Sequence, residues 1–509
     1  MQSQWTKERY RQEQEAFVSN HGGTTSQEVI YAILPNISSI LLAATTTGLI
    51  GKYVHRNLKL LLEFLLTVVP CILCCTLLSD HVITISFTML LISLINLIFM
   101  YNYGKHIFNN NIHRLSKRRP FITNFRAMIN ISTAVCILAV DFQIFPRKFV
   151  KTEAFGYSLM DTGVGLYIIA NALVCPEAKN FNVSPKSGFL NNFTRNIKDS
   201  TKNCIPLLIF GFGRMVAVEL AGYQKHVSEY GVHWNFFLTL ACVKCFTSMI
   251  SSTISSKYSL ISGIWIISMH EYILMTNGLR EWVLSNEPRK DFFSANREGI
   301  LSIPGYIGLY LLGVAVGRLI HSTYRNSDAQ TNLQFKIFSY SFDAAYNNSM
   351  VLCIKLSLIA AQTCATTLFC DSYFGVSRRL ANAGYCAWIL TLGSMLLTLL
   401  LLIEIILDIF LYNSHISEKL KSKVTNKGKF GIKEKAICST SMTLEIFEAV
   451  NYNGLLFFLI CNVMTGLINT VVHTLHVDKM GALEILIAYM AVDLVLILIL
   501  FRRKVQFKL

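Results

Sequence analysis

The stretch that decides the fold is Cys136–Gly165, which reads CILAVDFQIFPRKFVKTEAFGYSLMDTGVG. An apolar run ends on the carboxylate of Asp141, and a short aromatic and basic connection leads on to Lys151. The next apolar segment opens with Asp161 and the two glycines of GVG. This pattern predicts two membrane helices whose adjoining ends gather acid and base at a membrane boundary. A charged side chain inside a membrane helix, such as Asp141, is a candidate for function by default.

The composition around this stretch is that of a membrane protein. The chain has 509 residues, is 53% hydrophobic and only 15% charged, and has a mean hydropathy of +0.45. Soluble proteins carry roughly 25% charged residues. The sequence therefore predicts an all-α polytopic membrane protein, folded as one bundle rather than as several soluble domains.

Thirteen apolar segments are long enough to be membrane-helix candidates, because a spanning helix needs about 20 apolar residues. The eleventh is too long for one straight span, so it is tilted or continues into water. The fifth is short, so it is packed inside the bundle or continued by flanking residues. The thirteen segments are 29–50, 58–78, 82–103, 124–142, 158–174, 203–221, 233–253, 258–277, 299–320, 347–369, 380–412, 451–474 and 481–501.

The positively charged loops predict the orientation. Basic residues concentrate at 105–119, after the third segment, and at 419–435, after the eleventh. Both loops follow odd-numbered segments, and the positive-inside rule places them in the cytosol. The prediction is then a polar lumenal N-terminus at 1–28, a single transmembrane domain at 29–501 and a cytosolic basic tail at 502–509. The net charge of +16 reflects this topology rather than nucleic-acid binding.

Cysteine usage and the N-terminus add two expectations. Most of the fourteen cysteines lie in apolar runs, where they fill space as small hydrophobic residues, so we expect no disulfide framework and no metal site. The first 28 residues lack the apolar core of a cleavable signal peptide.

Asp141 and Lys151 are the first candidates for chemistry. Ala139 and Val140 should desolvate Asp141 and raise its pKa, which suits a general base. Lys151 lies across a proline-bearing turn, from which it could stabilise an oxyanion or hold the carboxylate. The alternative is a boundary ion pair that anchors two helices. Asp161 is a further candidate for a catalytic role, and the alternative is that it is a favourable charge at a helix N-terminus.

A second polar cluster, GYQKHVSEYGVHWNFF at 222–237, precedes the seventh segment. Polar and aromatic residues at a membrane edge suit a lipid headgroup site, and an ordinary interfacial belt is the alternative. The candidate substrate-binding residues are Arg147, Lys148, Arg214, His226, His233 and Asn235.

Three further features have both functional and structural interpretations. His270, followed by Glu271, lies in an apolar helix, where histidines are usually packed and hydrogen-bonded. Pro304 in NREGILSIPGY should break or kink the ninth helix near its start and could line a cavity. Asn462 and Asn469 share one helical face, which favours interhelical hydrogen bonding.

Several of these blocks resemble one family. ILAVDFQIFPRKFVKTEAFGYSLMDTGVG closely resembles the signature of the inositol acyltransferases of glycosylphosphatidylinositol (GPI) anchor biosynthesis, which include the phosphatidylinositol-glycan class W proteins and the fungal GPI-anchored wall transfer proteins. The resemblance extends to EAFVSNHGGTT at 15–25, to 222–237, to NREGILSIPGY and to NYNGLLFFLICNVMTGLIN at 451–469.

The resemblance implies a multi-pass enzyme of the endoplasmic reticulum membrane. Such an enzyme transfers a fatty acyl chain, usually palmitoyl, from acyl-CoA to the inositol ring of glucosaminyl-phosphatidylinositol, and acyl-CoA is a co-substrate rather than a resident cofactor. The residues matching the family's proposed catalytic pair are Asp141 and Lys151. Two competing hypotheses remain, a lipid transporter or scramblase and a non-catalytic subunit of a lipid-modifying complex.

Overall fold

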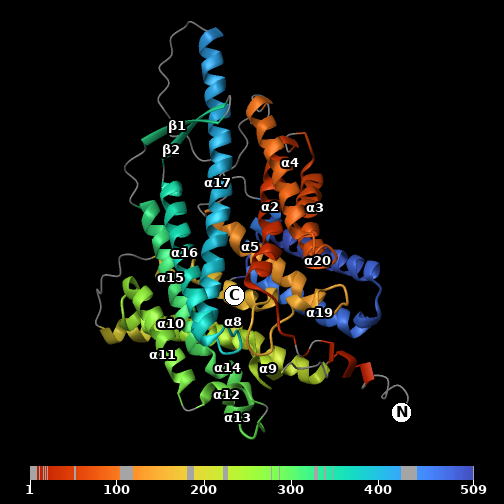
Figure 1. Cartoon of the computed structure of the whole chain (residues 1–509), viewed down its shortest axis with the longest axis vertical. Coiled ribbons are helices and arrows are strands. Elements are labelled where there is room, and N and C mark those ends of the chain that lie inside the picture. The colour runs from red at the N-terminus through yellow and green to blue at the C-terminus, as the bar shows by residue number, and fades with distance from the viewer. Residues whose placement is uncertain are drawn as a thin grey trace.

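A computed structural model describes residues 9–507, except 11, 15, 18, 20, 51–52, 104–118, 180–188, 222–226, 277, 286, 326–330, 338–339, 347 and 426–443. Within that range the chain is almost entirely helical, which confirms the all-α fold class (Figure 1).

Each of the thirteen predicted segments overlaps one long helix of the described chain. These helices are α2 (Ser26–Ile50), α3 (Arg56–Cys75), α4 (Val82–Tyr103), α5 (Pro120–Ala139), α6 (Leu159–Ala172), α8 (Phe189–Ala221), α10 (Phe236–Thr253), α11 (Ser259–Met275), α15 (Ile303–Arg325), α16 (Asn348–Phe374), α17 (Ala383–Thr425), α19 (Gly454–Val471) and α20 (Lys479–Arg502).

Short helices complete the described chain. They are η2 (Arg147–Phe149), α7 (Pro176–Lys179), α9 (Val227–Tyr230), η3 (Ser256–Tyr258), α12 (Leu279–Leu284), α13 (Phe292–Ala295), α14 (Arg297–Leu301), α18 (Glu445–Tyr452) and η4 (Thr474–His476).

Ten helical stretches in the described residues are long and apolar enough to cross a membrane, so the chain is a multi-pass membrane protein. The three predicted segments outside this set are α6, α8 and α11. Helix α6 has only 14 residues, and most of them are buried, so it packs inside the bundle as its short length predicted. Helix α11 has 17 residues, and α8 carries charged residues along its 33-residue length.

The eleventh segment forms the longest helix, α17, with 43 residues. Its apolar part ends at Phe410, and the helix continues beyond it, projecting past the neighbouring helices at the top of Figure 1. The sequence predicts a helix that is either tilted or continued beyond the membrane, and the structure shows a helix that continues past its apolar part.

Contacts between helix ends show which connections share a side of the bundle. Glu404, in the later part of α17, accepts a hydrogen bond of 3.2 Å from the backbone N–H of Phe121 at the start of α5. Arg119 stacks on Tyr324, near the end of α15, with its guanidinium carbon 3.2 Å from the ring centre. The start of α5, the end of α15 and the last two turns of the apolar part of α17 (Ala383–Phe410) therefore lie together, as the predicted topology requires. Which side faces the cytosol stays a prediction.

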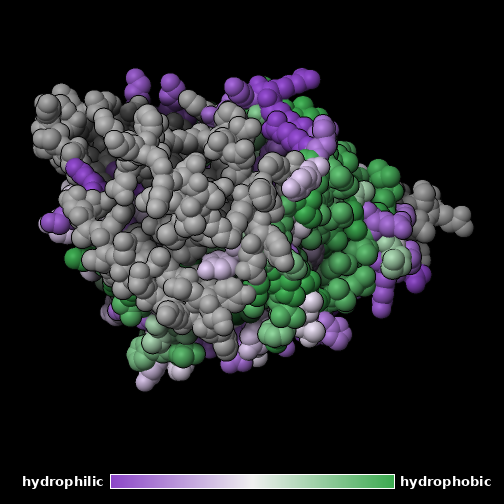
Figure 2. Space-filling view, turned by 90° about the horizontal axis from the view of Figure 1, so that it is seen from above, coloured by the Kyte–Doolittle hydropathy of each residue, from purple (hydrophilic) through white to green (hydrophobic). Residues whose placement is uncertain are grey.

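The helices share one large hydrophobic core, and the outward faces are also apolar. In α4, for example, Ile83 and Phe87 are 56% and 68% exposed. Figure 2 shows hydrophobic residues gathered over one side of the molecule, with hydrophilic residues near its margins. An exterior of this kind is stable only against lipid.

One element is not helical. Strands β1 (Thr331–Ile337) and β2 (Tyr340–Tyr346) pair in antiparallel register between α15 and α16, with Phe335 opposite Phe342. The segment search did not predict this hairpin, because hydropathy over a 20-residue window is insensitive to strands of seven residues.

The ninth predicted segment is interrupted, as its Pro-Gly pair predicted. Helix α14 ends at Leu301 and α15 begins at Ile303. Gly305 then packs so closely on the carbonyl of Ala381 that a Cβ there would lie 1.9 Å from the oxygen. Neither Pro304 nor Gly305 lines the large cavity described below, so the break serves helix packing, and the suggested role in lining a cavity does not hold for that cavity.

Candidate functional site

The site is built from the end of α5. The connection after Ala139 turns back on itself because the Arg147 guanidinium donates to the backbone carbonyls of Val140 (3.1 Å), Phe142 (3.0 Å) and Phe145 (2.8 Å). These include carbonyls that have no helical partner at a helix end. Arg147 therefore shapes the turn that presents Asp141.

Asp141 lies half-buried on this turn. Asn469 of α19 donates a hydrogen bond of 2.7 Å from its Nδ2 to the Oδ2 of Asp141. Burial raises the pKa of Asp141 to about 6, against the opposing effects of Asn469, Arg147 and Lys151. The predicted direction of this pKa shift is confirmed, and a carboxyl that ionises near neutrality suits proton transfer.

Lys151 does not pair with Asp141. Its Nζ lies 2.5 Å from Oε1 of Glu229, on α9, and both side chains are partly exposed to the cavity. Lys151 still acts on Asp141 through space, because its charge lowers the pKa of that carboxyl. The boundary ion pair expected as the alternative for Asp141 and Lys151 is therefore not formed.

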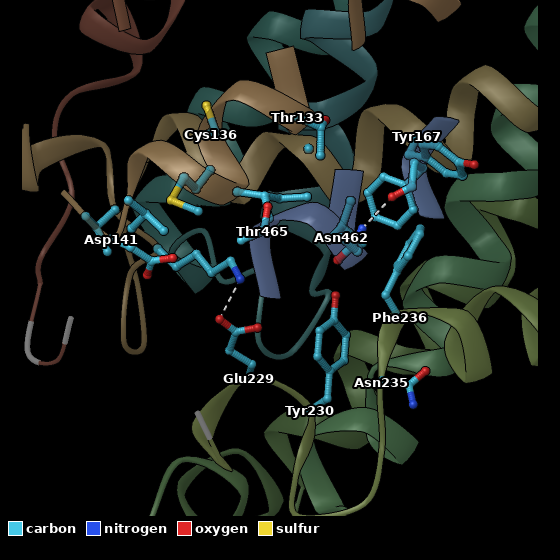
Figure 3. Close-up of a pocket in the computed structure, with 18 of the residues that line it drawn as sticks. Thr133, Cys136, Asp141, Tyr167, Glu229, Tyr230, Asn235, Phe236, Asn462 and Thr465 are labelled. Carbon is cyan, nitrogen blue, oxygen red and sulfur yellow. Dashed lines mark hydrogen bonds and ion pairs between the residues drawn. The ribbon is translucent and has the colours of Figure 1, made fainter. Parts of the chain in front are cut away.

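Both residues line one cavity of about 720 Å³. Asp141 and Glu229 project into the same space from different elements, with the dashed line at Glu229 marking its ion pair (Figure 3). The polar end of the cavity is lined by Asp141, Lys151, Thr152, Glu153, Arg214, Glu229, Tyr230, His233 and Arg378. The apolar end is lined by Met128, Ile129, Leu166, Tyr167, Phe236, Leu396 and Phe458.

The cavity also borders the apolar exterior. Val463 and Leu467 of α19 line it, and each is 55% exposed on the molecular surface. The arrangement can hold a molecule with a polar head and an apolar chain, and lipid can approach past α19.

Asp161 is a buried structural carboxylate. Its Oδ1 accepts from Nε of Arg378 at 2.6 Å, and its Oδ2 accepts from the backbone N–H and the hydroxyl of Thr152. Ser158 caps the start of α6 by accepting from the N–H of Asp161. Both Asp161 oxygens are thus engaged with protein groups, which favours the structural interpretation over the catalytic one.

Two candidate substrate-binding residues, Arg147 and Lys148, lie outside the cavity wall. Arg147 is committed to the turn and stacks over Phe17, 4.0 Å from the ring centre. Lys148 pairs at the surface with Asp80 at 3.4 Å and with Glu28 at 3.6 Å. The structure therefore does not bring these two cations to the cavity with Lys151.

Three other candidates do line the cavity. Arg214 and His233 present exposed side chains there. Asn235 is buried, and it caps α10 by accepting from the N–H groups of Phe237 and Leu238 while donating to a carbonyl of α8. His226 lies outside the described residues.

His270 and Glu271 do not reach the cavity. The His270 Nε2 lies 3.0 Å from the carbonyl oxygen of Leu380, and Glu271 accepts from the N–H of Ala383 at 2.7 Å. Both hold the connection between α16 and α17, so the packed interpretation of His270 is the one that the structure supports.

The described residues contain no cluster of three or more His, Cys, Asp or Glu that could hold a metal ion. The cysteines in that part of the chain are free thiols, so none of them is joined in a disulfide.

Two residues that contact Lys151 and Asp141 are not among the candidate site residues predicted from the sequence. Glu229 lies within the 222–237 cluster, and Asn469 lies in the 451–469 block, but neither was assigned to the site. Asn469 does bond across elements, as its helical face predicted, and its partner is Asp141. A signal existed in both cases, since each polar residue lies within five positions of a predicted segment boundary: Glu229 precedes the segment 233–253, and Asn469 lies near the end of the segment 451–474.

Comparison with known proteins identifies the family. A family model described as GWT1 matches residues 10–500. The chain is 32% identical to the mouse protein named glucosaminyl-phosphatidylinositol-acyltransferase PIGW, over 96% of this chain and 97% of that protein. It is 30% identical to GPI-anchored wall transfer protein 1 of Candida albicans, over 98% of this chain and 99% of that protein. It is 32% identical to the protein of the same name from Yarrowia lipolytica, over 79% and 76%. The chain therefore belongs to the GWT1 family.

Proposed function

We propose that this protein is an acyltransferase that moves a palmitoyl group from acyl-CoA to an inositol hydroxyl of glucosaminyl-phosphatidylinositol, in GPI-anchor biosynthesis in the endoplasmic reticulum membrane. The observation that carries the proposal is the placement of Asp141 and Lys151 on the wall of one cavity with a polar and an apolar end. The name of the mouse relative, glucosaminyl-phosphatidylinositol-acyltransferase, supports the same activity.

Asp141 is the general base of the proposed reaction. The inositol hydroxyl is a weak nucleophile, and it gives its proton to Asp141 as its oxygen attacks the thioester carbonyl carbon. The tetrahedral intermediate then collapses, the carbon–sulfur bond breaks, and the thiolate takes the proton from Asp141. This sequence forms one ester and one thiol and requires no covalent acyl-enzyme.

Lys151 stabilises the developing oxyanion. An ammonium has three donors, so Lys151 can keep its contact with Glu229 and still direct a second N–H toward the cavity. A donor placed where negative charge develops stabilises the transition state more than the bound substrate.

The cavity fits the two proposed substrates. The polar end suits the sugar and inositol headgroup, and the apolar end, which runs into the bundle toward Leu396 and Phe458, suits the acyl chain. In this proposal the acyl donor reaches Asp141 through the cavity from the opposite face of the bundle. On the predicted topology, with a lumenal N-terminus and a cytosolic C-terminus, that donor is cytosolic.

The experiment is acyl transfer by the purified protein, supplied with labelled palmitoyl-CoA and glucosaminyl-phosphatidylinositol. Asp141→Asn should lower turnover by about 10²–10⁴-fold, because an amide cannot accept the proton. Unimpaired transfer by Asp141→Asn would remove Asp141 from the mechanism. Movement of the lipid between leaflets without acyl transfer would instead indicate a transporter, and transfer only after another protein is added would indicate a non-catalytic subunit.

A further inference from the structure

The carboxylate of Asp141, which is proposed as the base, accepts a hydrogen bond from a residue far away in the sequence. Asn469 lies 328 positions beyond Asp141, on α19, and its Nδ2 donates to Asp141 Oδ2 at 2.7 Å. Asn469 does not line the cavity, whereas Asp141 does. The amide therefore contacts the carboxylate from outside the cavity wall.

We infer that Asn469 is a positioning residue for Asp141, holding one carboxylate oxygen so that the other faces the cavity. Its role in catalysis rests on the proposed function. A hydrogen bond from a neutral amide favours the ionised form of a carboxyl and fixes its plane. Without it, the Asp141 carboxyl is free to rotate about its side-chain torsions.

Charged and titratable groups near Asp141 lie on its own connection, on α9 and on the segment after α19. Arg147 and Lys151, on the same connection, favour the ionised carboxylate, and Glu229 of α9 forms an ion pair with Lys151. On the segment after α19, His473 and His476 contact the N-terminal residues rather than Asp141: each ring packs against Tyr10, and His476 lies 3.8 Å from Glu13. None of these groups is removed by a substitution at position 469, so a shift in the titration of Asp141 reports the amide.

The decisive measurement is the pH dependence of carbodiimide labelling at Asp141 in the folded protein in detergent, followed by digestion and mass spectrometry of the peptide that contains Asp141. Carbodiimides react with the protonated carboxyl, so the labelling midpoint reports its titration and needs no enzymatic activity. Asn469→Ala should move the midpoint up by about one pH unit, the size expected for one hydrogen bond to a charged acceptor.

Asn469→Asp makes the test stricter. It keeps the size of the side chain but places a second carboxylate beside Asp141, so the midpoint should rise further than in Asn469→Ala. A packing role predicts the opposite order, because the isosteric change would then be the milder one. The matched control is Asn130→Ala, which removes a buried asparagine of α5 that donates to its own helix, and its midpoint should equal that of wild type.

The acyl-transfer assay on the same variants separates the two proposals. In Asn469→Ala we expect kcat to fall about tenfold with KM nearly constant, because orientation of the base is lost and the substrate contacts are kept. A shifted midpoint with no transfer by wild type would overturn the proposed function and leave the positioning of Asp141 standing. A midpoint that is unchanged in Asn469→Ala, or higher in Ala than in Asp, would overturn the positioning role.

Discussion

At the scale of single residues, two aspartates of the same stretch have opposite surroundings. Within the part of the chain that the structure describes, Asp141 faces a cavity with one amide donor and no ion-pair partner, and Asp161 is enclosed by Arg378 and Thr152. A carboxylate with its hydrogen bonds satisfied by protein is held in place, and one that faces a cavity is available to a substrate. The residues that surround each aspartate, rather than the residue type, therefore give Asp141 a functional role and Asp161 a structural one.

The pH profile of turnover is the first residue-scale prediction. Since Asp141 must be ionised to accept a proton and its pKa is raised to about 6, activity should be lost as pH falls through 6 and should be present above it. The measurement is kcat against pH. An acid limb centred near 4, the ordinary range of a carboxyl, would contradict the assignment.

Lys151 offers a second prediction. Lys151→Ala should lower kcat by about 10²–10³-fold with a modest change in KM, as for the loss of one oxyanion donor. Lys257→Ala is the matched control, because Lys257 lies beside Tyr258, outside the cavity wall. A pure rise in KM for Lys151→Ala would place Lys151 in substrate binding instead.

The buried pair of Asp161 and Arg378 gives a prediction of stability. Asp161→Asn leaves Arg378 as an unpaired buried cation, which should cost about 3–5 kcal/mol of folding free energy. Asp141→Asn should cost far less, because burial already disfavours the charge of Asp141. Thermal unfolding in detergent compares the stability of the two variants. Equal melting temperatures for Asp161→Asn and Asp141→Asn would argue against a structural role that only Asp161 has.

At the scale of elements, hydrogen bonds between the connections of distant helices, here called clamps, hold the site together. The HGGTT segment, residues 21–25, runs beside the segment before α6, where the N–H of Thr24 donates to the carbonyl of Tyr157 at 2.7 Å. Asn296, before α14, accepts from the N–H groups of His233 and Trp234 and so fixes the approach to α10. These clamps join the ends of distant helices around the polar end of the cavity.

The two glycines of HGGTT should respond differently to substitution. Gly23 has φ +79°, and a Cβ there would meet the carbonyl oxygen of Tyr157, so Gly23→Ala should cost about 1–3 kcal/mol and free the segment. Gly22 has no atom within 4 Å of an added Cβ, so Gly22→Ala is its matched control. Hydrogen exchange at Thr24 measures the effect, and equal protection in both variants would contradict it.

At the scale of the whole molecule, the parity of the membrane crossings is open to a direct test. Thirteen crossings place the termini on opposite sides of the membrane, whereas ten would place them together. We predict that α6, α8 and α11 also cross, because the helix-end contacts follow the thirteen-segment order. A glycosylation tag at the N-terminus should be modified and one at the C-terminus should not. Modification of both tags or of neither would contradict this count.

The sequence by itself determined the all-helical membrane fold and the first two site candidates. Hydropathy over 20 residues is a local property, and each apolar segment must satisfy its own backbone as a helix in lipid. The positions of Asp141 at a segment end and of Lys151 in the connection that follows are local in the same sense.

Only the tertiary structure decided the partners. Arg147, Lys148 and Lys151 are neighbours in one basic stretch, yet only Lys151 reaches the cavity. Asn469 and Glu229 contact Asp141 and Lys151 from 328 and 78 positions away. A hydrogen bond forms only where donor and acceptor meet within about 3 Å, and the packing of helices far apart in the chain fixes that distance.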